Sequence, residues 1–460
     1  MPPIVKELQS RPMVLHSIAL GLALATKAHP WFLVFVVPVV ILGSGWTARV
    51  VSMSLAVVGI LLAPGQVQSL MERQYVDRSM DIVTVPRTGK SGDWCIAEGG
   101  GTRLGLFLGN SGTQLSLGDR IHLKGVVRTL KEGSEQFWLS KGVVGTMFIG
   151  RDNSIVVTQQ GSPIFRWGMS WRQSFIDFAG ANLSKRHAAL ADALCFNLDA
   201  LLDKDLQDNL ARTGTVHIVS ASGLHVMIFA VAFQLVLSKL PIPRWAQLIV
   251  LLFFLLVYAG ATGFRPPVLR AVVMVGVMMS AYLVRREGDL LSAAGLAAIA
   301  QFFLDPRSVF DIGFYLSFIT VSALALFLPL DAPRWGKEAV IRSAQASFVA
   351  SLASAPIVSH VFGRFSLVSI LANLAIGISI APIVAGGLGA WALHFVWPAG
   401  AGAIMNYGVS PFCSYLEWVV NMMGRLPFAS LETPSFSAYW IPAFYVASLL
   451  LWRFKRRSAE

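Results

Sequence analysis

Long apolar runs fill the first 65 residues of the chain and most of it after residue 214. Three early runs, at 13–28, 31–46 and 50–63, are at or below the roughly 17–25 residues of a membrane-crossing helix, so the number that cross stays open. The later runs lie at 216–238, 245–262, 267–284, 290–304, 312–330, 343–361, 366–397, 403–423 and 438–452. Together they predict a polytopic α-helical membrane protein.

Between residues 66 and 161 the long runs give way to short alternating segments with glycine-rich turns. In the clearest segment, 118–128, Ile121, Leu123 and Val127 share one face of a strand. Further segments lie at 81–85, 104–108, 136–140, 143–149 and 155–158. Short strands at this spacing predict a small β-barrel or sandwich outside the membrane.

Four basic residues share the other face of the 118–128 strand: Arg120, His122, Lys124 and Arg128. With Phe107 and Trp138 beside it, this face has the cations and aromatic rings of a groove for single-stranded nucleic acid. Alternating basic residues are also typical of the solvated face of a half-buried strand, and the nearly balanced charge of residues 66–161 favours that interpretation. Both hypotheses stay open.

Residues 162–213 contain two helical patterns. In 164–180, Trp and Phe recur every three or four residues opposite polar residues, which is typical of an amphipathic helix in the membrane interface. The second pattern, 186–213, has leucines on one side and leads into the next apolar run.

That run begins with a dense polar stretch, Arg212 to His225. Polar groups entering a bilayer are costly, so His217, Ser220, Ser222 and His225 form a candidate site. The alternative is a helix start at which Ser220 and Ser222 cap free backbone N–H groups.

Other polar residues interrupt later apolar runs. Arg265 and Arg270 flank a Pro-Pro pair; Arg265 is close enough to a helix end to extend to the interface, whereas Arg270 lies deeper and is expected to face inward. Asn373 and Pro382 lie within 366–397, where a broken helix would make 373–387 a second candidate site.

Composition excludes a soluble globular protein: 55% of the 460 residues are apolar and 13% are charged. The net charge of +12 fits either basic cytoplasmic loops or attraction to a polyanion such as nucleic acid. The three cysteines lie far apart in unlike contexts, and we predict no catalytic residue, metal site or cofactor.

Basic residues mark alternate loops, as expected of cytoplasmic loops. They are Lys239 and Arg244; Arg285 and Arg286; Arg334, Lys337 and Arg342; and Arg453, Lys455, Arg456 and Arg457. This pattern places the C-terminus inside the cell. The β region and the start of the 216–238 run then lie outside the cytoplasmic membrane.

Four ordered segments resemble the ComEC competence proteins, which are membrane channels for DNA import in natural transformation. They are Thr213-Gly-Thr-Val-His-Ile-Val-Ser-Ala-Ser-Gly-Leu-His-Val226, Pro267-Val-Leu-Arg-Ala-Val-Val-Met274, Asp305-Pro-Arg-Ser-Val-Phe-Asp-Ile-Gly-Phe-Tyr-Leu-Ser-Phe318 and Ala355 through Leu374. The strand at Gly118-Asp119 also looks like the OB-type domain of that family. Two positions depart from its usual pattern: Ser220 precedes Ala221-Ser222 where the family has Ala-Ile-Ser, and Pro267 stands where a serine is common.

The resemblance implies a channel that moves single-stranded DNA across the cytoplasmic membrane. Expected domains are 1–65 (N-terminal membrane helices), 66–161 (an extracytoplasmic OB-like β domain), 162–213 (amphipathic and interfacial helices) and 214–460 (the channel core). The strand path would include His217, Ser220, Ser222, His225, Arg265, Arg270 and Asn373. The family's metallo-β-lactamase-type domain is not expected here, so the implied partners are single-stranded DNA, membrane lipid, a separate nuclease, a DNA receptor and a cytosolic helicase or single-strand-binding protein.

Two other hypotheses come from different classes of protein. Ser220 to Gly223 and His360 to Gly363 resemble the nucleophile and base motifs of rhomboid-type intramembrane proteases, with Ser222 and His360 as the catalytic pair. A small-solute transporter would show internal repeats of its helix pattern, and the sequence shows no convincing repeat.

Overall fold

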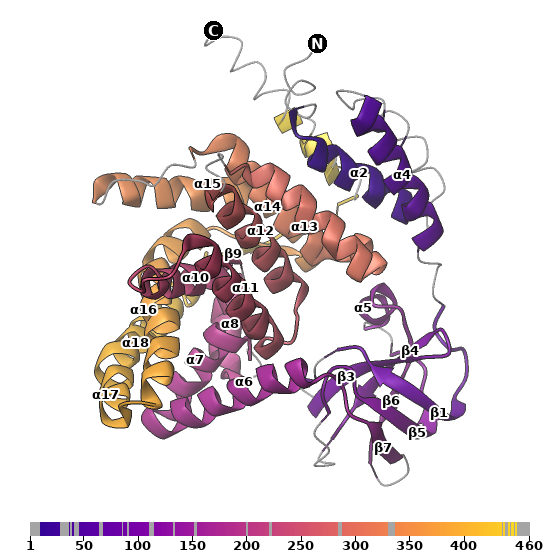
Figure 1. Cartoon of the computed structure of the whole chain (residues 1–460), viewed down its shortest axis with the longest axis horizontal. Coiled ribbons are helices and arrows are strands. Elements are labelled where there is room, and N and C mark those ends of the chain that lie inside the picture. The colour runs from indigo at the N-terminus through magenta and orange to yellow at the C-terminus, as the bar shows by residue number, and fades with distance from the viewer. Residues whose placement is uncertain are drawn as a thin grey trace.

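The computed structural model shows a body of apolar helices with a separate β domain at one side (Figure 1). It describes residues 10–27, 36, 39–40, 46–63, 68–84, 86–89, 92–109, 115–131, 134–150, 154–198, 201–219, 223–283, 288–329, 336–434, 436–437, 440–441, 443–445 and 447–448. The expected runs at 31–46 and 438–452 therefore lie largely outside the described residues.

The first helices form an antiparallel pair, α2 (Pro12–Leu24) and α4 (Trp46–Leu62), with the short η1 (Ala25–Lys27) after α2. A buried hydrogen bond joins His16 Nδ1 to Ser52 Oγ at 2.7 Å across the pair. The pair also packs through α2 on α13 (Leu290–Leu304), so the beginning of the chain joins its second half.

The β domain is a curled sheet of seven strands in the order β6-β4-β3-β1-β5-β7, with β2 paired to β3. Neighbours are antiparallel except β4 and β6, which are parallel. Arg128 and Thr146 exchange two backbone hydrogen bonds of 2.7 and 2.9 Å, so the end of β5 bridges back to β6. The strands are β1 (Gln74–Ile82), β2 (Arg87–Gly89), β3 (Gly92–Gly99), β4 (Thr102–Phe107), β5 (Arg120–Val127), β6 (Val143–Phe148) and β7 (Ser154–Gln159).

The predicted alternation of the 118–128 strand is confirmed, because Ile121, Leu123 and Val127 are fully buried in the sheet's core while its basic residues face outward. The strand expected at 136–140 is wrong. That segment is helix α5 (Glu135–Ser140), whose turn brings Phe137 and Trp138 together against the ring of Trp94. A strand would send these adjacent side chains to opposite faces.

A continuous helix, α6 (Pro163–Asn182), leads from the β domain into the helical body. It crosses α11 (Arg244–Ala261) so closely that a Cβ added to Gly168 would lie 2.5 Å from the backbone carbonyl carbon of Gly260. The expected aromatic stripe is present, but Phe175 and Phe178 are buried in the protein core instead of facing a membrane surface. Two shorter helices follow, α7 (Lys185–Phe196) and α8 (Lys204–Arg212).

The helical body contains the remaining apolar runs. Among the described residues, α11, α15 and α16 are long and apolar enough to cross a membrane, while α2, α4, α10, α12, α13 and α14 contain shorter apolar stretches. The bounds after α8 are α9 (Val216–Val219), α10 (Gly223–Leu237), α12 (Pro266–Leu283), η4 (Pro306–Phe310), α14 (Ile312–Phe327), α15 (Lys337–Phe362), β8 (Arg364–Ser366), α16 (Ser369–His394), α17 (Pro398–Ala403), η5 (Ile404–Val409), α18 (Ser410–Gly424) and β9 (Ser430–Glu432).

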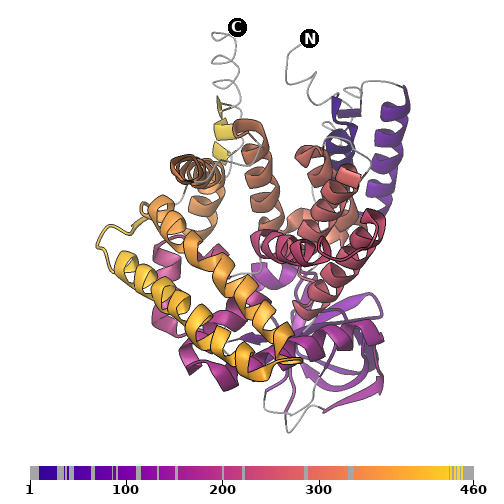
Figure 2. The same cartoon turned by 60° about the vertical axis from the view of Figure 1, so that its left-hand side comes forward.

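The hypothesis of a broken helix within 366–397 is wrong, because α16 runs without interruption through Pro382. A proline removes a single N–H from the helix ladder, and packing against neighbouring helices can compensate for it. α16 contacts α15 and lies beside α18, as Figure 2 shows for the orange and yellow helices.

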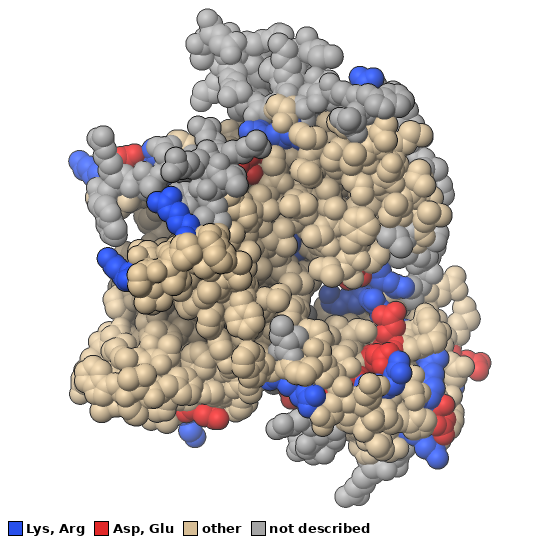
Figure 3. All heavy atoms as spheres, in the orientation of Figure 1, with Lys and Arg blue, Asp and Glu red and all other residues tan. Residues whose placement is uncertain are grey.

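Charged side chains gather on the β domain, whereas the visible face of the helical body is mostly uncharged (Figure 3). Large apolar side chains of the helical body, such as Phe253 and Trp245, are exposed on the surface of the protein. An uncharged apolar exterior around apolar helices is what a lipid environment requires.

The close crossing of α6 and α11 gives a testable consequence. We expect Gly168→Ala to destabilise the protein by roughly 1–3 kcal/mol, because the added methyl forces two helix backbones apart. Gly180→Ala is the matched control on the same helix: nothing lies within 4 Å of its added Cβ, so helix propensity alone should stabilise it by up to about 1 kcal/mol. Thermal unfolding of the detergent-solubilised chain measures both, and equal shifts would contradict the crossing.

Candidate functional site

The polar stretch that begins at Arg212 folds into a tight turn, followed by two helices. The hydroxyls of Thr213 and Thr215 are fully buried and lie 2.7 Å apart, and the Thr213 hydroxyl donates to the carbonyl of Asn209 at 2.8 Å. Between them Gly214 has a φ of +71°, and a Cβ there would lie 2.9 Å from Cβ of Ser366. This part of the stretch therefore fixes the turn against β8 and the start of α16.

The two histidines of the stretch lie in different environments. His217 on α9 is exposed, with Nδ1 3.1 Å from the carbonyl oxygen of Gly214. His225 on α10 is 1% exposed, and neither of its ring nitrogens has a hydrogen-bond partner among the described residues. Ser220 and Ser222 lie outside the described residues, so the structure does not test whether Ser222 contacts His360. The ring of His360 packs on Phe436.

Arg270 is buried, as the sequence predicts, and it joins three helices. From α12 its guanidinium donates to Gln301 Oε1 on α13 at 2.9 Å, and to Ser317 Oγ (3.2 Å) and the Gly313 carbonyl (3.3 Å) on α14. All three acceptors are uncharged, so a full positive charge is held by neutral groups. Gln301 and Ser317 were not predicted from the sequence, although a lone glutamine in the apolar 290–304 run could have identified the first.

The other two residues of the predicted strand path have different roles. Arg265 donates from Nη2 to the Asn197 carbonyl at 3.1 Å, at the left-handed residue that ends α7. It thereby satisfies a carbonyl at a helix C-terminus, a favourable position for a cation. Asn373, in the first turns of α16, keeps its buried Oδ1 without a hydrogen-bond partner in the described part of the chain.

The basic face of β5 is paired with carboxylates on β1. Arg120 contacts Asp81 through two hydrogen bonds of 2.8 and 3.1 Å, and His122 lies 2.8 Å from Asp77, which Lys124 also approaches at 3.9 Å. The register places Asp81 opposite Arg120 and Asp77 opposite Lys124. These partners were missed because sequence alone does not give the pairing of β1 with β5.

The aromatic side chains beside this face form a packed cluster. Trp138 is only 6% exposed and packs edge-on against Trp94 (5.1 Å between ring centroids) and Phe107 (5.9 Å). The expectation that Trp138 offers an open ring to bases is therefore wrong, since its faces are used in packing. Phe107 is half-buried and stacks on Phe148, over which Arg128 lies at 5.5 Å.

The loop that contains η4 meets the β domain. Asp305 and Asp311 accept backbone N–H bonds at the starts of η4 and α14, which explains two acidic residues of the 305–318 segment as helix caps. Arg103 of β4 lies 3.9 Å from Asp305, and Arg307 fills the space where Gly142 has no side chain. The loop thus connects the β domain to the helical body.

A buried carboxylate on α7 is a further residue that the sequence did not single out. Asp192 is 4% exposed and its Oδ1 has no hydrogen-bond partner among the described residues. Burial raises the pKa of Asp192 to about 7. No group of three or more His, Cys, Asp or Glu side chains in the described part of the chain could hold a metal ion.

The role of Arg270 as a brace can be tested by a double-mutant cycle. We expect Arg270→Met to destabilise the chain by about 2–5 kcal/mol, because it leaves buried acceptors on two helices unpaired. In the Gln301→Leu background the same change should cost about 1–3 kcal/mol less, since one of those acceptors is already gone. Unfolding in detergent measures all four forms, and strictly additive losses would exclude the bond as a brace.

Asp192 predicts a pH dependence of stability. Its folded pKa of about 7 exceeds the unfolded value of about 3.9, so the folded state binds the proton more tightly. The wild type should therefore lose stability as pH rises from about 4 to above 7. Asp192→Asn should unfold at a higher temperature than the wild type at pH 8 and at nearly the same temperature at pH 4. The exposed Asp208→Asn is the control, and an equal effect of both would contradict the assignment.

Comparisons with known proteins cover the same helical region. A family model described as "Competence protein" matches residues 194–458, which include the polar stretch, Arg270 and Asn373. ComE operon protein 3 of Bacillus subtilis (strain 168) is 30% identical over 206 residues, which are 45% of this chain and 26% of that protein. Competence protein ComA of Neisseria gonorrhoeae is 30% identical over 255 residues, 52% of this chain and 35% of the relative.

A third relative, Recombination protein 2 of Haemophilus influenzae, is 27% identical over 153 residues, 31% of this chain and 19% of that protein. The matches thus span about a third or less of each relative's length, and no solved structure gives a significant match. The family model covers more than half of the 460 residues, including all the helices from α8 to α18. The chain therefore belongs to the competence protein family.

Proposed function

We propose that this chain forms a channel through which single-stranded DNA crosses the cytoplasmic membrane during natural transformation. Membership of the competence protein family supports this proposal, as do relatives named for competence and recombination. The apolar helices and their uncharged exterior fit a membrane location. A strand of phosphates needs a hydrated path through such a body, because lipid offers no hydrogen bonds.

The observation that carries the proposal is the presence of unpartnered polar atoms deep among these helices. Both ring nitrogens of His225 and Oδ1 of Asn373 are buried without a hydrogen-bond partner among the described residues, in the first turns of α10 and α16, which contact each other. Buried polar atoms in proteins almost always have partners, so such atoms point to water or a polar ligand beside them. A hydrated passage along the starts of α10 and α16 would satisfy them.

Arg270 contributes to such a path through its charge. Its donors are directed at neutral acceptors, so the guanidinium is fixed in place, and no carboxylate of the described residues is among its hydrogen-bond partners. A fixed positive charge near a hydrated passage attracts phosphate without having to reorient. Arg270 would therefore attract the phosphates of the strand through its fixed positive charge. His217, at the exposed end of the stretch, would meet the strand earlier.

The β domain is proposed to be an OB-like barrel that receives the strand outside the membrane. Five of its strands follow the cyclic order β1-β3-β4-β6-β5, with one parallel pair and a bridge from β5 to β6, which fits a small, partly open five-stranded barrel. Because Asp77 and Asp81 pair with its basic face, binding there would be weak and salt-sensitive. A DNA receptor, a nuclease and a cytosolic helicase or single-strand-binding protein are the proposed partners.

The test uses the unpartnered histidine. In a naturally competent host that carries this chain as its sole copy, we expect His225→Leu to lower the entry of labelled DNA into a nuclease-resistant state. The loss should be roughly five- to tenfold, the rate equivalent of losing one or two hydrogen bonds. Stability should be kept or should rise, because leucine removes a buried group that has no partner.

The matched control is His360→Leu, since His360 is exposed at the end of α15 and lies outside the proposed path. It should leave both DNA entry and protein level unchanged. Wild-type DNA entry by His225→Leu at a normal protein level would contradict the proposed passage. Loss of entry in His360→Leu alone would contradict the placement of the path, which leaves His360 outside it.

A further inference from the structure

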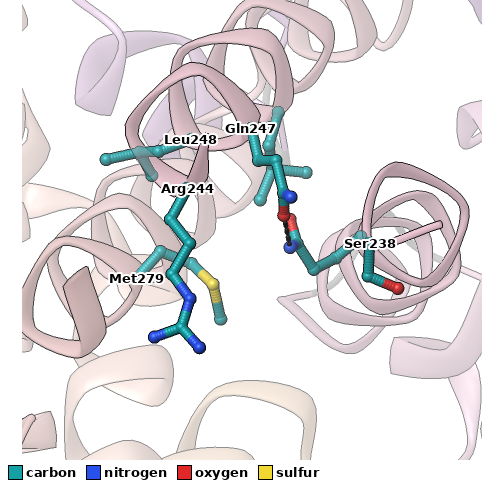
Figure 4. A pocket seen from close by; sticks show the side chains of 7 residues that line it. Ser238, Arg244, Gln247, Leu248 and Met279 are labelled. Atoms are coloured by element: carbon teal, nitrogen blue, oxygen red, sulfur yellow. Dashed lines mark hydrogen bonds between the residues drawn. The ribbon is translucent and has the colours of Figure 1, made fainter. Parts of the chain in front are cut away.

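A pocket lies between α10, α11 and α12, at the ends of these helices that are opposite to the polar stretch. Its volume is about 240 Å³, well above the roughly 10–15 Å³ that a single water molecule needs. The end of α10 and the beginning of α11 supply most of the lining, and Met279 near the end of α12 completes it. Figure 4 shows Arg244 and Met279 on one side of the pocket and Ser238 on the other. The lining residues are Gln234, Ser238, Arg244, Gln247, Leu248, Leu251 and Met279.

One wall of this pocket is polar and rich in donors. Gln234 Nε2 donates to Gln247 Oε1 at 2.8 Å, and Gln247 Nε2 donates to the Ile242 carbonyl at 3.1 Å. Each amide nitrogen carries a second hydrogen, and Arg244 adds a guanidinium whose fork matches a phosphate. Among the described residues that line the pocket there is no Asp or Glu, and Arg244 supplies a positive charge.

The other side of the pocket is apolar, formed by Leu248, Leu251 and Met279. The outer surface beside it is apolar as well: Leu235, Val236 and Trp245 are each more than 60% exposed. A tryptophan beside an arginine at the end of an apolar helix is typical of the headgroup level of a membrane. A ligand held here would therefore have a polar end in the pocket and an apolar end in contact with lipid-facing side chains.

We propose that this pocket binds the phosphate-bearing headgroup of an anionic membrane lipid. Arg244 contacts the phosphate, the second amide hydrogens of Gln234 and Gln247 contact the ester oxygens, and the acyl chains leave over Leu235 and Val236. In the sequence, Lys239 follows α10, and the segment after α12 carries Arg285 and Arg286 together with the acidic Glu287 and Asp289. Basic pockets between membrane helices on the cytoplasmic side are suited to anionic headgroups. The pocket is separate from the proposed DNA path.

The experiment measures lipid binding by the full chain without DNA. Purified chain in neutral detergent is titrated with phosphatidylglycerol, with phosphatidylcholine and with inorganic phosphate, and retained lipid and unfolding temperature are recorded. We expect phosphatidylglycerol to bind and to raise the unfolding temperature, and phosphatidylcholine and inorganic phosphate to have little effect. Arg244→Gln should weaken phosphatidylglycerol binding about tenfold or more, the loss of one charge-assisted contact.

Two further variants keep the test decisive. Ser238→Phe should block binding by filling the pocket while every charge stays in place, and Arg425→Gln is the matched control because Arg425 is an exposed arginine at the end of α18. Equal weakening by Arg244→Gln and Arg425→Gln, or full binding by Ser238→Phe, would overturn the site. If inorganic phosphate raised the unfolding temperature as much as phosphatidylglycerol does, the pocket would be a site for a free anion and the lipid proposal would be overturned. Because no DNA is present, none of these outcomes bears on the proposed channel.

Discussion

The need to satisfy buried polar groups without water governs this structure. Most of the polar side chains among the apolar helices find partners inside the protein: Thr213 bonds to the end of α8, Arg265 to the end of α7 and Arg270 to α13 and α14. Each of these bonds joins segments that are distant in sequence or closes a turn. Buried atoms without a hydrogen-bond partner among the described residues also occur on Asp192, Gln301, Ser308 and His394, but those of His225 and Asn373 lie on two helices that contact each other.

The same polar residues show why sequence could predict some features and not others. Apolar periodicity was sufficient to locate α6, α11 to α14 and the strand at 120–127, because burial on one face leaves a regular pattern. It was insufficient at 135–140, where a short run of aromatic residues forms a helix inside an aromatic cluster. That Arg270 is buried could be inferred from its depth in an apolar run. Its partners Gln301 and Ser317 depend on how three helices pack, which no local pattern encodes.

The charges of the β domain illustrate a related difficulty. An alternating basic strand looks like a phosphate-binding face when viewed alone, but pairing with β1 places a carboxylate beside three of its four basic residues. Surface pairs of this kind contribute little stability and are weakened by salt. Their larger effect is to lower the positive potential that a nucleic acid would meet. Charge on a strand can be interpreted only with the sequence of its neighbour.

The junction between the β domain and the helical body consists of two separate attachments. Asp119 accepts backbone N–H bonds from Ser116 and Gly161, both at 2.7 Å, which fixes the entry to α6, and Arg307 and Asp305 contact Gly142 and Arg103 at a second point. Two anchors at different places remove the hinge that a single linker would provide. The contacts at these two places therefore restrict rotation of the β domain against the helices, so a movement of the one is passed to the other.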